Sequence, residues 1–529
     1  ISNAFTPSGT RGNYTFTGAY TQNPQRRPGS GSGVADLLLG IPLNANTTTP
    51  TIGDLRQRYY GFYVQDDWQV SRNLTLNLGL RWDLNSPFWD TRDRMSNFIM
   101  ERDSPDFNKF VLAGSRSSSI EDRAMVKFYK FNFAPRFGFA YRLPRNTVIR
   151  SSYGVFNSGT TLFGINGRLS FNPPFNQSYS YAGDQVNPVF TLAQGIPPNA
   201  LQPTINQVNR SIISYDPNTP NGYLQQWMMN VQTELRPNLL LEVAYAGTVG
   251  HKLTGSRNAN QPRPGAGALQ PRSPFPQFIN INRVEAFANS TYHAFEMKLE
   301  RRFSAGFRLT MAYTWSHFLD DTQTILDLAG AGIQDAFNRR AEKGNANYDV
   351  RQRFVSSYAY ELPVGKGKHW LSNPGVASNV LGGWQLNGIV AAQAGRPFTP
   401  TLNFNAANAG GAQRPDRTAS GVLDSDSRSI DRWFDVTAFR APNGFAFGNS
   451  GRNILTGPAL VNWDFSLFKN MQVTERFRLQ FRFESFNFLN HPNFAVPNAV
   501  IGTGPAGTIS SVANGVSPRQ NQFALKLVF

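Results

Sequence analysis

The side chains most often used for chemistry are few and scattered in this chain of 529 residues. It contains no cysteine, which removes disulfides, iron–sulfur clusters and thiolate catalysis together. Its histidines show none of the spacings typical of a zinc site. They are His251, His293, His317, His369 and His491. The sequence therefore predicts no metal centre and no cofactor.

Two glycine-rich stretches match phosphate-binding loops in their letters only. Residues 502–507 read G-x-G-x-x-G, but Pro505 interrupts them and they lie between predicted strands. No helix N-terminus is then expected there to receive a phosphate. Residues 365–368 read Gly-Lys-Gly-Lys and lack the earlier glycine and the following Ser or Thr of a P-loop. Both stretches are interpreted as ordinary loops.

Carboxylates offer a weaker possibility. Asp66-Asp67 and Asp320-Asp321 lie near predicted strand ends, where such pairs could bind Ca²⁺ at the surface. Adjacent carboxylates in solvated loops usually bind nothing tightly. No Ser/His/Asp arrangement and no acid–base pair can be argued from the spacing of the remaining residues. The sequence does not predict an enzyme.

Two charged ladders remain, each made of alternate residues. Because side chains of a strand point to opposite faces in turn, alternate residues share one face. We expect these ladders to line a lumen, where they compensate neighbouring charges or contact a plug or a solute. The first ladder is Glu296, Lys298, Glu300 and Arg302, and the second is Arg478, Gln480, Arg482 and Glu484.

The residues between the charges are apolar, which indicates a second face of opposite character. Phe477, Leu479, Phe481 and Phe483 alternate with the second ladder. If this face meets lipid, an Arg placed on it at mid-bilayer would cost roughly 2 to 4 kcal/mol. Arg is then expected to impair folding more on this face than on the charged one. The residues assigned to lipid for this test are Leu76, Leu78, Phe481 and Leu525, and the polar comparison sites are Asn77 and Gln480.

Composition favours one large barrel over several soluble domains. Aromatic residues make up 13% of the chain, and the mean hydropathy is -0.37. No run approaches the roughly 18 to 20 apolar residues of a spanning helix, whereas in a barrel only every second residue meets lipid. The formal charge is +17, but the cations are spread along the chain, so nucleic acid is not predicted as a partner. They are expected to line a lumen and to decorate loops near anionic headgroups.

Period-two alternation recurs in about fourteen segments, of which the first is residues 13–20 and the clearest is residues 74–83. The repeating unit is a strand, a tight turn, a strand and a long polar loop. The predicted hairpins are residues 60–83, 137–155, 227–245, 295–315, 354–390 and 463–484. The long segments lie near residues 85–130, 158–222, 250–290, 319–348, 395–459 and 489–520.

Strict alternation of short and long connections predicts an all-β transmembrane antiparallel β-barrel with long extracellular loops. Outer-membrane barrels have short periplasmic turns and long outer loops, whereas a soluble sandwich has no reason to sort its loops in this way. Trp68, Trp82, Trp315, Trp384 and Trp463 lie at strand ends, as an interfacial girdle requires. Charges are also expected to avoid the apolar face. With fourteen strands, both chain ends are expected on the periplasmic side.

Seven stretches carry a resemblance to a known family. In chain order they are residues 35–42, 60–68 (YGFYVQDDW), 77–83 (NLGLRWD), 135–141 (PRFGFAY), 313–316 (YTWS), 382–384 (GGW) and 484–492 (ESFNFLNHP). The chain resembles the large TonB-dependent outer-membrane receptors of the Oar-like (OmpA-related) type over nearly its whole length. Each motif is weak alone, and their order makes the resemblance more specific.

The resemblance implies parts that are not visible in residues 1–529. Members of that family have a carboxypeptidase-regulatory-like domain, a TonB-contacting segment and a plug ahead of a 22-stranded barrel. No signal peptide is visible in the residues that follow Ile1, so the chain is expected to be mature or part of a longer protein. We interpret residues 1–529 as the C-terminal portion of such a barrel. The rival interpretation is a complete pore of about fourteen strands.

The expected location is the bacterial outer membrane, and the expected function is that of a receptor and transporter for an unidentified solute. The alternative is a passive channel, or a structural or adhesive outer-membrane protein. Expected partners are outer-membrane lipid and lipopolysaccharide, the outer-membrane assembly machinery, and a TonB-type energy-coupling protein that contacts the region upstream. The resemblance implies an assembly signal at the end of the chain, formed by Phe523, Leu525, Leu527 and Phe529.

Overall fold

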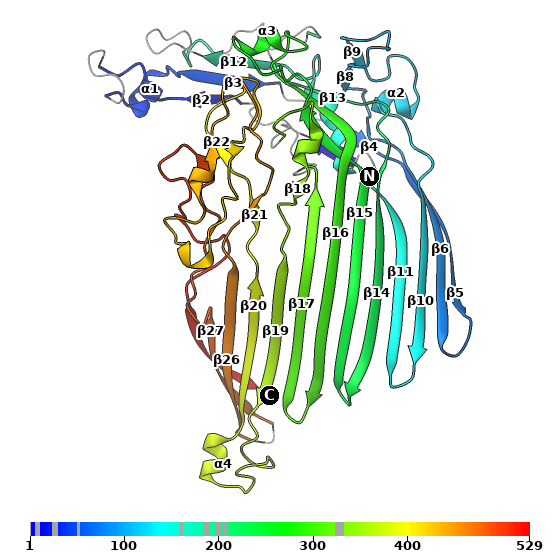
Figure 1. Cartoon of the computed structure of the whole chain (residues 1–529), viewed down its shortest axis with the longest axis vertical. Coiled ribbons are helices and arrows are strands. Elements are labelled where there is room, and N and C mark those ends of the chain that lie inside the picture. Colours follow the sequence, from blue (N-terminus) through cyan, green and yellow to red (C-terminus); the bar gives the residue numbers. More distant parts are fainter. Residues whose placement is uncertain are drawn as a thin grey trace.

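The computed structural model describes residues 2–5, 11–23, 30–49, 53–158, 162–182, 191–195, 204–205, 210–322, 333–474 and 476–529. These residues form one broad antiparallel sheet, here called the wall, and an irregular layer of loops at one end of it (Figure 1). None of the helices in the described ranges has the length and hydropathy that a membrane crossing requires.

The wall is an up-and-down sheet in which each strand pairs antiparallel with its neighbours along the chain. The described sheet has 15 strands, of which β13 (Ile212–Tyr215) and β18 (Gly344–Asn345) lie off the main path, leaving thirteen in sequence. Those thirteen are β5 (Tyr59–Gln69), β6 (Leu74–Asn85), β10 (Phe133–Leu143), β11 (Thr147–Ser158), β14 (Gly222–Arg236), β15 (Leu239–Asn258), β16 (Ile281–Ser304), β17 (Phe307–Asp320), β19 (Gln352–Glu361), β20 (Trp384–Gln393), β26 (Leu460–Gln472), β27 (Arg478–Phe486) and β29 (Gln520–Val528).

Tight turns join the strands at one end of the wall, as the sequence predicts. Residues 70–73, 144–146, 237–238, 305–306 and 473–477 are the shortest connections. Ala305 and Gly306 both have positive φ, at 52° and 79°, which matches the twist that two-residue hairpins require. One connection at this end is longer, residues 362–383, and contains the helix α4 (Val376–Leu381). The predicted sorting of short and long connections is confirmed for five of the six connections at this end, and residues 362–383 are the exception.

The predicted first strand is wrong. From residues 13–20 only β2 (Asn13–Thr15) is extended, and it pairs with β3 (Asn44–Thr48), which also pairs with β12 (Ser178–Ala182), in a separate small sheet. Gly18 ends the extended run because its φ is +82° and an added Cβ would lie 2.6 Å from the backbone of Gly31. The wall begins at β5, so its path has thirteen strands and not fourteen.

Because the number of strands in the path is odd, the N-terminal segment lies at the loop end of the wall and not at the turn end. Since neighbouring strands are antiparallel, β5 and β29 run in the same direction, from the loop end to the turn end. β29 therefore ends beside the tight turns, with Val528 opposite Arg478. β1 (Ser2–Phe5) pairs with β4 (Gly53–Arg56) among the long loops (Figure 1). The predicted placement of both chain ends on the same side is wrong.

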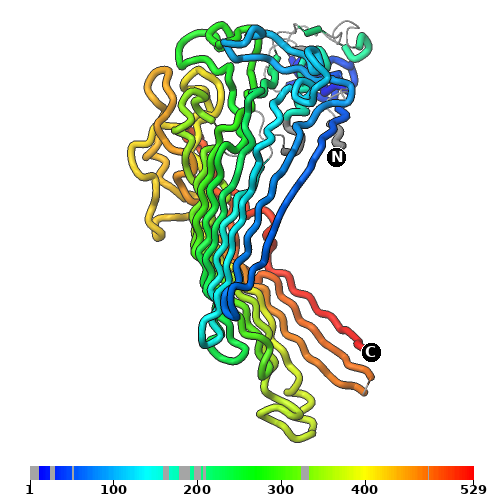
Figure 2. The backbone as a smooth tube through the Cα atoms, turned by 90° about the vertical axis from the view of Figure 1, so that its right-hand side faces the viewer, coloured from blue at the N-terminus to red at the C-terminus, as the bar shows by residue number. Residues whose placement is uncertain are grey.

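The wall curves into a trough, with β5 and β29 swung toward the same side (Figure 2). In the described chain β5 pairs only with β6, and β29 pairs only with β27. The two edges are not joined to each other, so the described sheet is open.

The two faces of the wall differ in character as predicted, but the apolar face carries some charges. Its apolar side chains are exposed; Leu525, for example, is 70% exposed. Asp66, Arg301 and Lys469 lie on this face because they are in register with Leu78, Leu309 and Phe481. Asp66 and Arg301 lie close to the tight turns, where a charged head can reach water beside an apolar stem. Lys469 is also near the turns, but it is buried and donates to backbone carbonyls.

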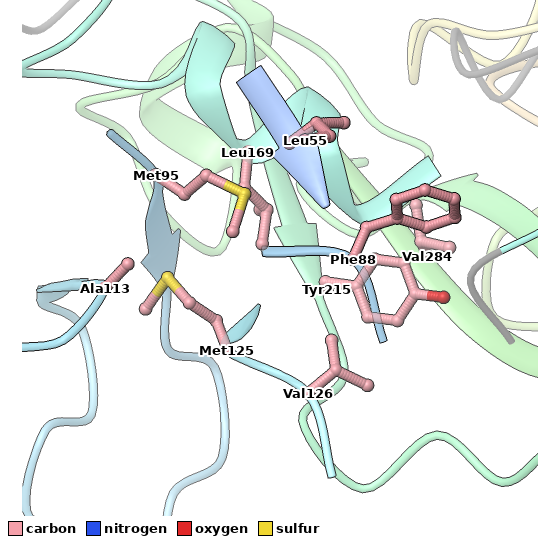
Figure 3. Close-up of a cluster of buried hydrophobic side chains, with 9 residues drawn as sticks. All are labelled: Leu55, Phe88, Met95, Ala113, Met125, Val126, Leu169, Tyr215 and Val284. Carbon is pink, nitrogen blue, oxygen red and sulfur yellow. The ribbon is translucent and has the colours of Figure 1, made fainter. Parts of the chain in front are cut away.

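The loop layer contains the buried core. One cluster joins residues from the segment before β5, from the loops that follow β6 and β11, and from β16, and Figure 3 shows its side chains gathered between these segments. Its members are Leu55, Phe88, Met95, Ala113, Met125, Val126, Leu169, Tyr215 and Val284. A second cluster around Phe98 includes Ile212, Ala259, Phe278 and Ile281, and a third around Phe434 joins the loops that follow β20 and β27.

β15 and β16 extend beyond the other strands into this layer, so the predicted loop 250–290 is shortened to residues 259–280. The layer also contains short elements. They are α1 (Gly33–Leu39), β7 (Trp89–Asp90), β8 (Ser96–Phe98), β9 (Phe110–Leu112), α2 (Ile120–Ala124), η1 (Leu162–Phe171), α3 (Leu269–Arg272), η2 (Arg339–Glu342), β21 (Pro397–Phe398), β22 (Thr401–Leu402), β23 (Asp416–Arg417), η3 (Ser425–Ser427), η4 (Val436–Ala438), β24 (Phe439–Arg440), β25 (Leu455–Thr456) and β28 (Val500–Ile501).

Candidate functional site: the polar face of the wall

The polar face of the wall is the side that bears the predicted charged ladders. Strand register extends this face across the sheet, because directly opposed residues point the same way. One row crosses seven strands from β6 to β17 and is made mostly of small or polar residues. The row is Asn77, Gly138, Ser152, Met228, Ala246, Ala294 and Ser316.

A hollow of about 810 Å³ lies over this row, between β5 and β15. Its floor is formed where the polar face lacks large side chains, at Gly79, Gly138 and Gly154. An ideal Cβ at Gly79 or Gly138 would lie 3.5 Å or more from any neighbour, which is ordinary contact. The fold therefore does not require glycine at these two positions. Their effect is to leave space on the polar face.

Arginine side chains give the hollow its charge. Its lining includes Arg136 and Arg150 but no Asp or Glu. The guanidinium carbon of Arg136 lies 5.0 Å from the ring centre of Phe156, and Arg150 Nη1 donates to Gln232 Oε1 at 2.6 Å. An arginine that lies over an aromatic ring keeps its charge and its outward-facing donors. The hollow thus offers a cationic surface with an aromatic neighbour.

The ladder on β16 lies on the polar face next to this region. Lys298 Nζ donates to Glu300 Oε2 at 2.9 Å, while Glu296 is exposed opposite Ala244. Arg302 lines a smaller hollow of about 230 Å³ together with Glu234. The charges are therefore balanced along β16 and across to β14.

The ladder on β27 is held by its own neighbours. Gln480 Nε2 donates to Asn470 Oδ1 at 2.8 Å, and Arg482 Nε donates to Gln480 Oε1 at 2.7 Å. Glu484 accepts from Gln522 at 3.1 Å, and Arg478 lies opposite Gln472 near the turns. Four strands separate β27 from β16, so the structure does not bring the two ladders together.

The predicted assembly residues share the apolar face of the edge strand. Leu527, Leu525 and Phe523 oppose Leu479, Phe481 and Phe483 on β27. The Phe523 ring centre lies 5.2 Å from that of Phe483, and Phe529 follows the strand with its side chain exposed. These side chains form a continuous apolar strip at the end of the sheet.

The acidic pairs already have protein partners. Asp320 forms an ion pair with Arg452, and both oxygens of Asp321 accept from Asn289. Asp67 Oδ1 accepts from Asn77. Across the ranges that the structure describes, no three His, Asp or Glu side chains gather as metal ligands would.

Sequence reasoning missed the hollow. A glycine in a predicted strand is usually interpreted as a destabilising residue or as a bulge. Its neighbours across the sheet depend on the register between strands, which the sequence does not show. One sequence signal could have indicated the hollow, namely small residues at alternate positions of two segments. They are Gly138 and Ala140 in the first segment and Ser152 and Gly154 in the second. Their alignment between paired strands becomes visible only in the fold.

Comparison with known proteins identifies the family to which this chain belongs. Residues 1–522 match the family model described as an outer membrane beta barrel domain. The chain belongs to the outer membrane β-barrel domain family. It is a protein of the bacterial outer membrane.

Solved structures of outer-membrane receptors and transporters are similar at low identity. They include the outer membrane transporter YddB from Escherichia coli, at 10% identity and a TM-score of 0.46, with 92% of this chain and 49% of that chain covered. The ferripyoverdine receptor of Pseudomonas aeruginosa is 11% identical, with a TM-score of 0.42 and coverage of 91% and 40%. The chain spans about half or less of these structures. No curated protein sequence matches it.

Proposed function

We propose that this barrel domain is the wall of an outer-membrane receptor and transporter that takes up a solute. Its apolar face is assigned to lipid and its polar face to the lumen. The lumen residues are then the two ladders and the residues of the hollow. The observation that carries the proposal is the hollow of about 810 Å³ on the polar face, below long loops that are packed into a layer.

The open edges require additional strands. β5 and β29 run in the same direction, so direct pairing between them would be parallel and would break the antiparallel pattern of the wall. An open edge exposed to lipid leaves backbone groups unsatisfied. We propose that an odd number of further antiparallel strands joins β29 to β5. Nine such strands would complete the 22 that the Oar-like resemblance implies.

Energy coupling is proposed on that resemblance alone. In receptors of the resembled type, a TonB-type protein contacts a segment ahead of the barrel, and a plug fills the lumen. The lining of the hollow, with Arg136 and Arg150 and no carboxylate, favours a solute or a plug surface that bears negative charge. The terminal strip from Phe523 to Phe529 is proposed as the signal that the assembly machinery reads.

The proposal is tested on the protein produced from its full coding sequence and isolated from outer membranes. Heat-modifiable migration on a gel is expected, because closed barrels resist unfolding by detergent until heated. In planar bilayers bathed in KCl, a plugged transporter is expected to give no steady conductance. A protein that stays soluble without detergent would refute the barrel, and steady ohmic conductance would favour the passive channel.

The passive channel remains the second candidate because the hollow and the ladders would also suit a water-filled pore. An upstream sequence that encodes a plug and a TonB-contacting segment would favour the transporter. A signal peptide directly before Ile1 would instead support the channel or an adhesive role for the loops.

A further inference from the structure

One connection at the turn end differs from the others. Residues 362–383, here called the extension, project beyond the lower ends of the strands and contain α4 (Figure 1). The other tight connections at this end have two to five residues. A short hairpin would suffice to join β19 to β20, so the extra residues call for a separate explanation.

The base of the extension is fixed by close backbone contacts. Gly383 has a φ of +73°, and an added Cβ would lie 2.5 Å from the carbonyl oxygen of Asn470 on β26. A Cβ at Gly365 would lie 2.7 Å from the Cα of Gly382, which brings the two ends of the extension together. Within it, Trp370 N donates to the Pro363 carbonyl at 2.9 Å and Gly365 N donates to the Trp370 carbonyl at 2.8 Å. The extension is thus an ordered unit.

Lys469 attaches α4 to the apolar face of the wall. It stands on that face opposite Trp384 and is only 7% exposed. Its Nζ donates to the carbonyls of Asn379 at 2.6 Å and Val380 at 3.0 Å, and also to that of Gly382. A cation is favoured at a helix C-terminus, where carbonyls lack partners within the helix.

Trp384 reinforces this attachment. Its indole Nε1 donates to the Val380 carbonyl at 3.2 Å, and Lys469 Nζ lies 5.4 Å from its ring centre. Both anchoring side chains belong to the apolar face, so the C-terminal end of α4 is on the same side as the residues assigned to lipid. The apolar face of the wall therefore continues into the extension.

The extension exposes large apolar side chains that nothing in the described chain covers. Val376 is 81% exposed, and its neighbours on α4 and in the preceding loop are more than two-fifths exposed. These neighbours are Trp370, Leu371, Val380 and Leu381. The extension also contains two lysines, Lys366 and Lys368, of which Lys368 is paired with Glu361 of β19 at 2.8 Å. With five exposed apolar side chains beside these two cations, apolar contact rather than attraction to anions is expected to dominate its binding.

We propose that the extension docks into the headgroup region of the periplasmic leaflet and holds this side of the barrel against phospholipid. The occupant is lipid because Lys469 and Trp384 fix the C-terminal end of α4 to the apolar face beside the tight turns, and the exposed residues of the extension continue that face. Trp370 supplies an amphipathic ring of the kind found at membrane interfaces. The assignment to the periplasmic leaflet rests on the proposed function and on the expectation from the sequence that the tight turns are periplasmic.

Single labels test the proposal, since residues 1–529 contain no cysteine and any cysteine elsewhere in the full-length protein can first be replaced by serine. Val376→Cys and Leu381→Cys are made in the full-length protein, labelled with an environment-sensitive fluorophore and reconstituted into phosphatidylethanolamine and phosphatidylcholine vesicles. We expect a blue-shifted emission and quenching by a lipid that carries a nitroxide near its headgroup. Val422→Cys, which is exposed in the loop layer, is the matched control and is expected to show neither effect.

Leu525→Cys separates the two proposals. A quenched label at 525 together with water-like labels at 376 and 381 would overturn the lipid contact of the extension and leave the barrel intact. A water-like label at 525 would refute the lipid-facing wall itself. In a second variant, Lys469→Met should lower the quenching at 376 at least twofold, and Lys469→Arg should restore it. Unchanged quenching in Lys469→Met would overturn the role of Lys469 as anchor.

Discussion

The wall and the loop layer of this protein differ in whether their apolar side chains are buried or exposed. In the loop layer Leu55, Met95 and Leu169 have no exposed surface, and they come from separate loops. On the wall, apolar side chains of similar size are exposed; Leu525 and Phe523 are 70% and 69% exposed. The two regions thus follow opposite rules of burial within one chain.

This difference reflects two solvents. The loop layer packs its apolar side chains inward, as a protein in water does, because burial removes them from water. The wall turns the same residue types outward, which is stable where the surrounding medium is hydrocarbon. The wall satisfies its backbone groups by strand pairing, whereas the irregular loops combine backbone–backbone bonds with bonds from side chains.

Asparagine and arginine side chains supply those bonds in the loop layer. Asn97 both donates to the Tyr215 carbonyl at 2.7 Å and accepts from the Tyr215 amide at 2.9 Å, as a paired strand would. Arg210 donates to the Asn176 carbonyl at 2.7 Å, and its burial lowers its pKa to about 10. The loop layer is therefore a folded unit with its own polar framework.

The largest expected effect is on the buried ion pair of the loop layer. Glu342 Oε2 accepts from Arg414 Nη1 at 2.8 Å, with the two side chains 1% and 3% exposed. Glu342→Ala leaves Arg414 buried without this carboxylate and is expected to cost about 3–5 kcal/mol. The loops after β17 and β20 should then become sensitive to limited proteolysis, while the heat-modifiable migration of the wall is retained.

The matched control is Glu361→Gln, which removes the exposed pair with Lys368 at the opposite end of the molecule. Exposed pairs contribute little, about 0–1 kcal/mol. Loss of heat-modifiable migration in Glu342→Ala would show that the wall and the loop layer unfold together, and would contradict their independence.

The next effect concerns apolar packing. Leu55→Ala removes a fully buried side chain from the cluster in Figure 3 and is expected to cost about 2–5 kcal/mol, because the surrounding loops can collapse only partly. Hydrogen exchange should rise in residues 86–126 and 162–171. Leu525→Ala on the wall is the control and should leave the protection of those residues unchanged. Equal loss of protection in both variants would contradict a separate loop core.

The difference between the two regions also explains which parts of the fold could be predicted from the sequence. Wall strands such as β6 were predictable because alternation is a local property that survives in any context. The loop layer was not, since Leu55, Leu169 and Tyr215 meet only through long-range contacts. The first strand was wrong because Asn13–Thr15 has the right local pattern and a different partner. The hollow depends on register between strands, which the sequence does not display.

A charge on the apolar face gives the third effect. Leu78→Arg is expected to cost about 2–4 kcal/mol if the residue lies near mid-bilayer, and to reduce the folded band on a gel. Asn77→Arg, one residue away, should fold nearly normally because Asn77 lies on the polar face beside Asp67. Equal damage by the two substitutions would refute the assignment of the two faces.

The smallest expected effect on stability comes from a substitution that compares the two faces of the wall. Gly138 and Phe137 are neighbours on β10 that point to opposite faces, and a Cβ at Gly138 would be 3.5 Å from its nearest neighbour. Gly138→Cys is therefore expected to change stability by less than about 1 kcal/mol. In membranes, a charged, water-soluble thiol reagent should modify the cysteine at 138 at least tenfold faster than one introduced by Phe137→Cys. Since residues 1–529 have no other cysteine, the rate reports each position alone once any cysteine outside these residues has been replaced by serine. Comparable rates, or the reverse order, would place lipid on the side of the hollow and remove the basis for assigning it to the lumen.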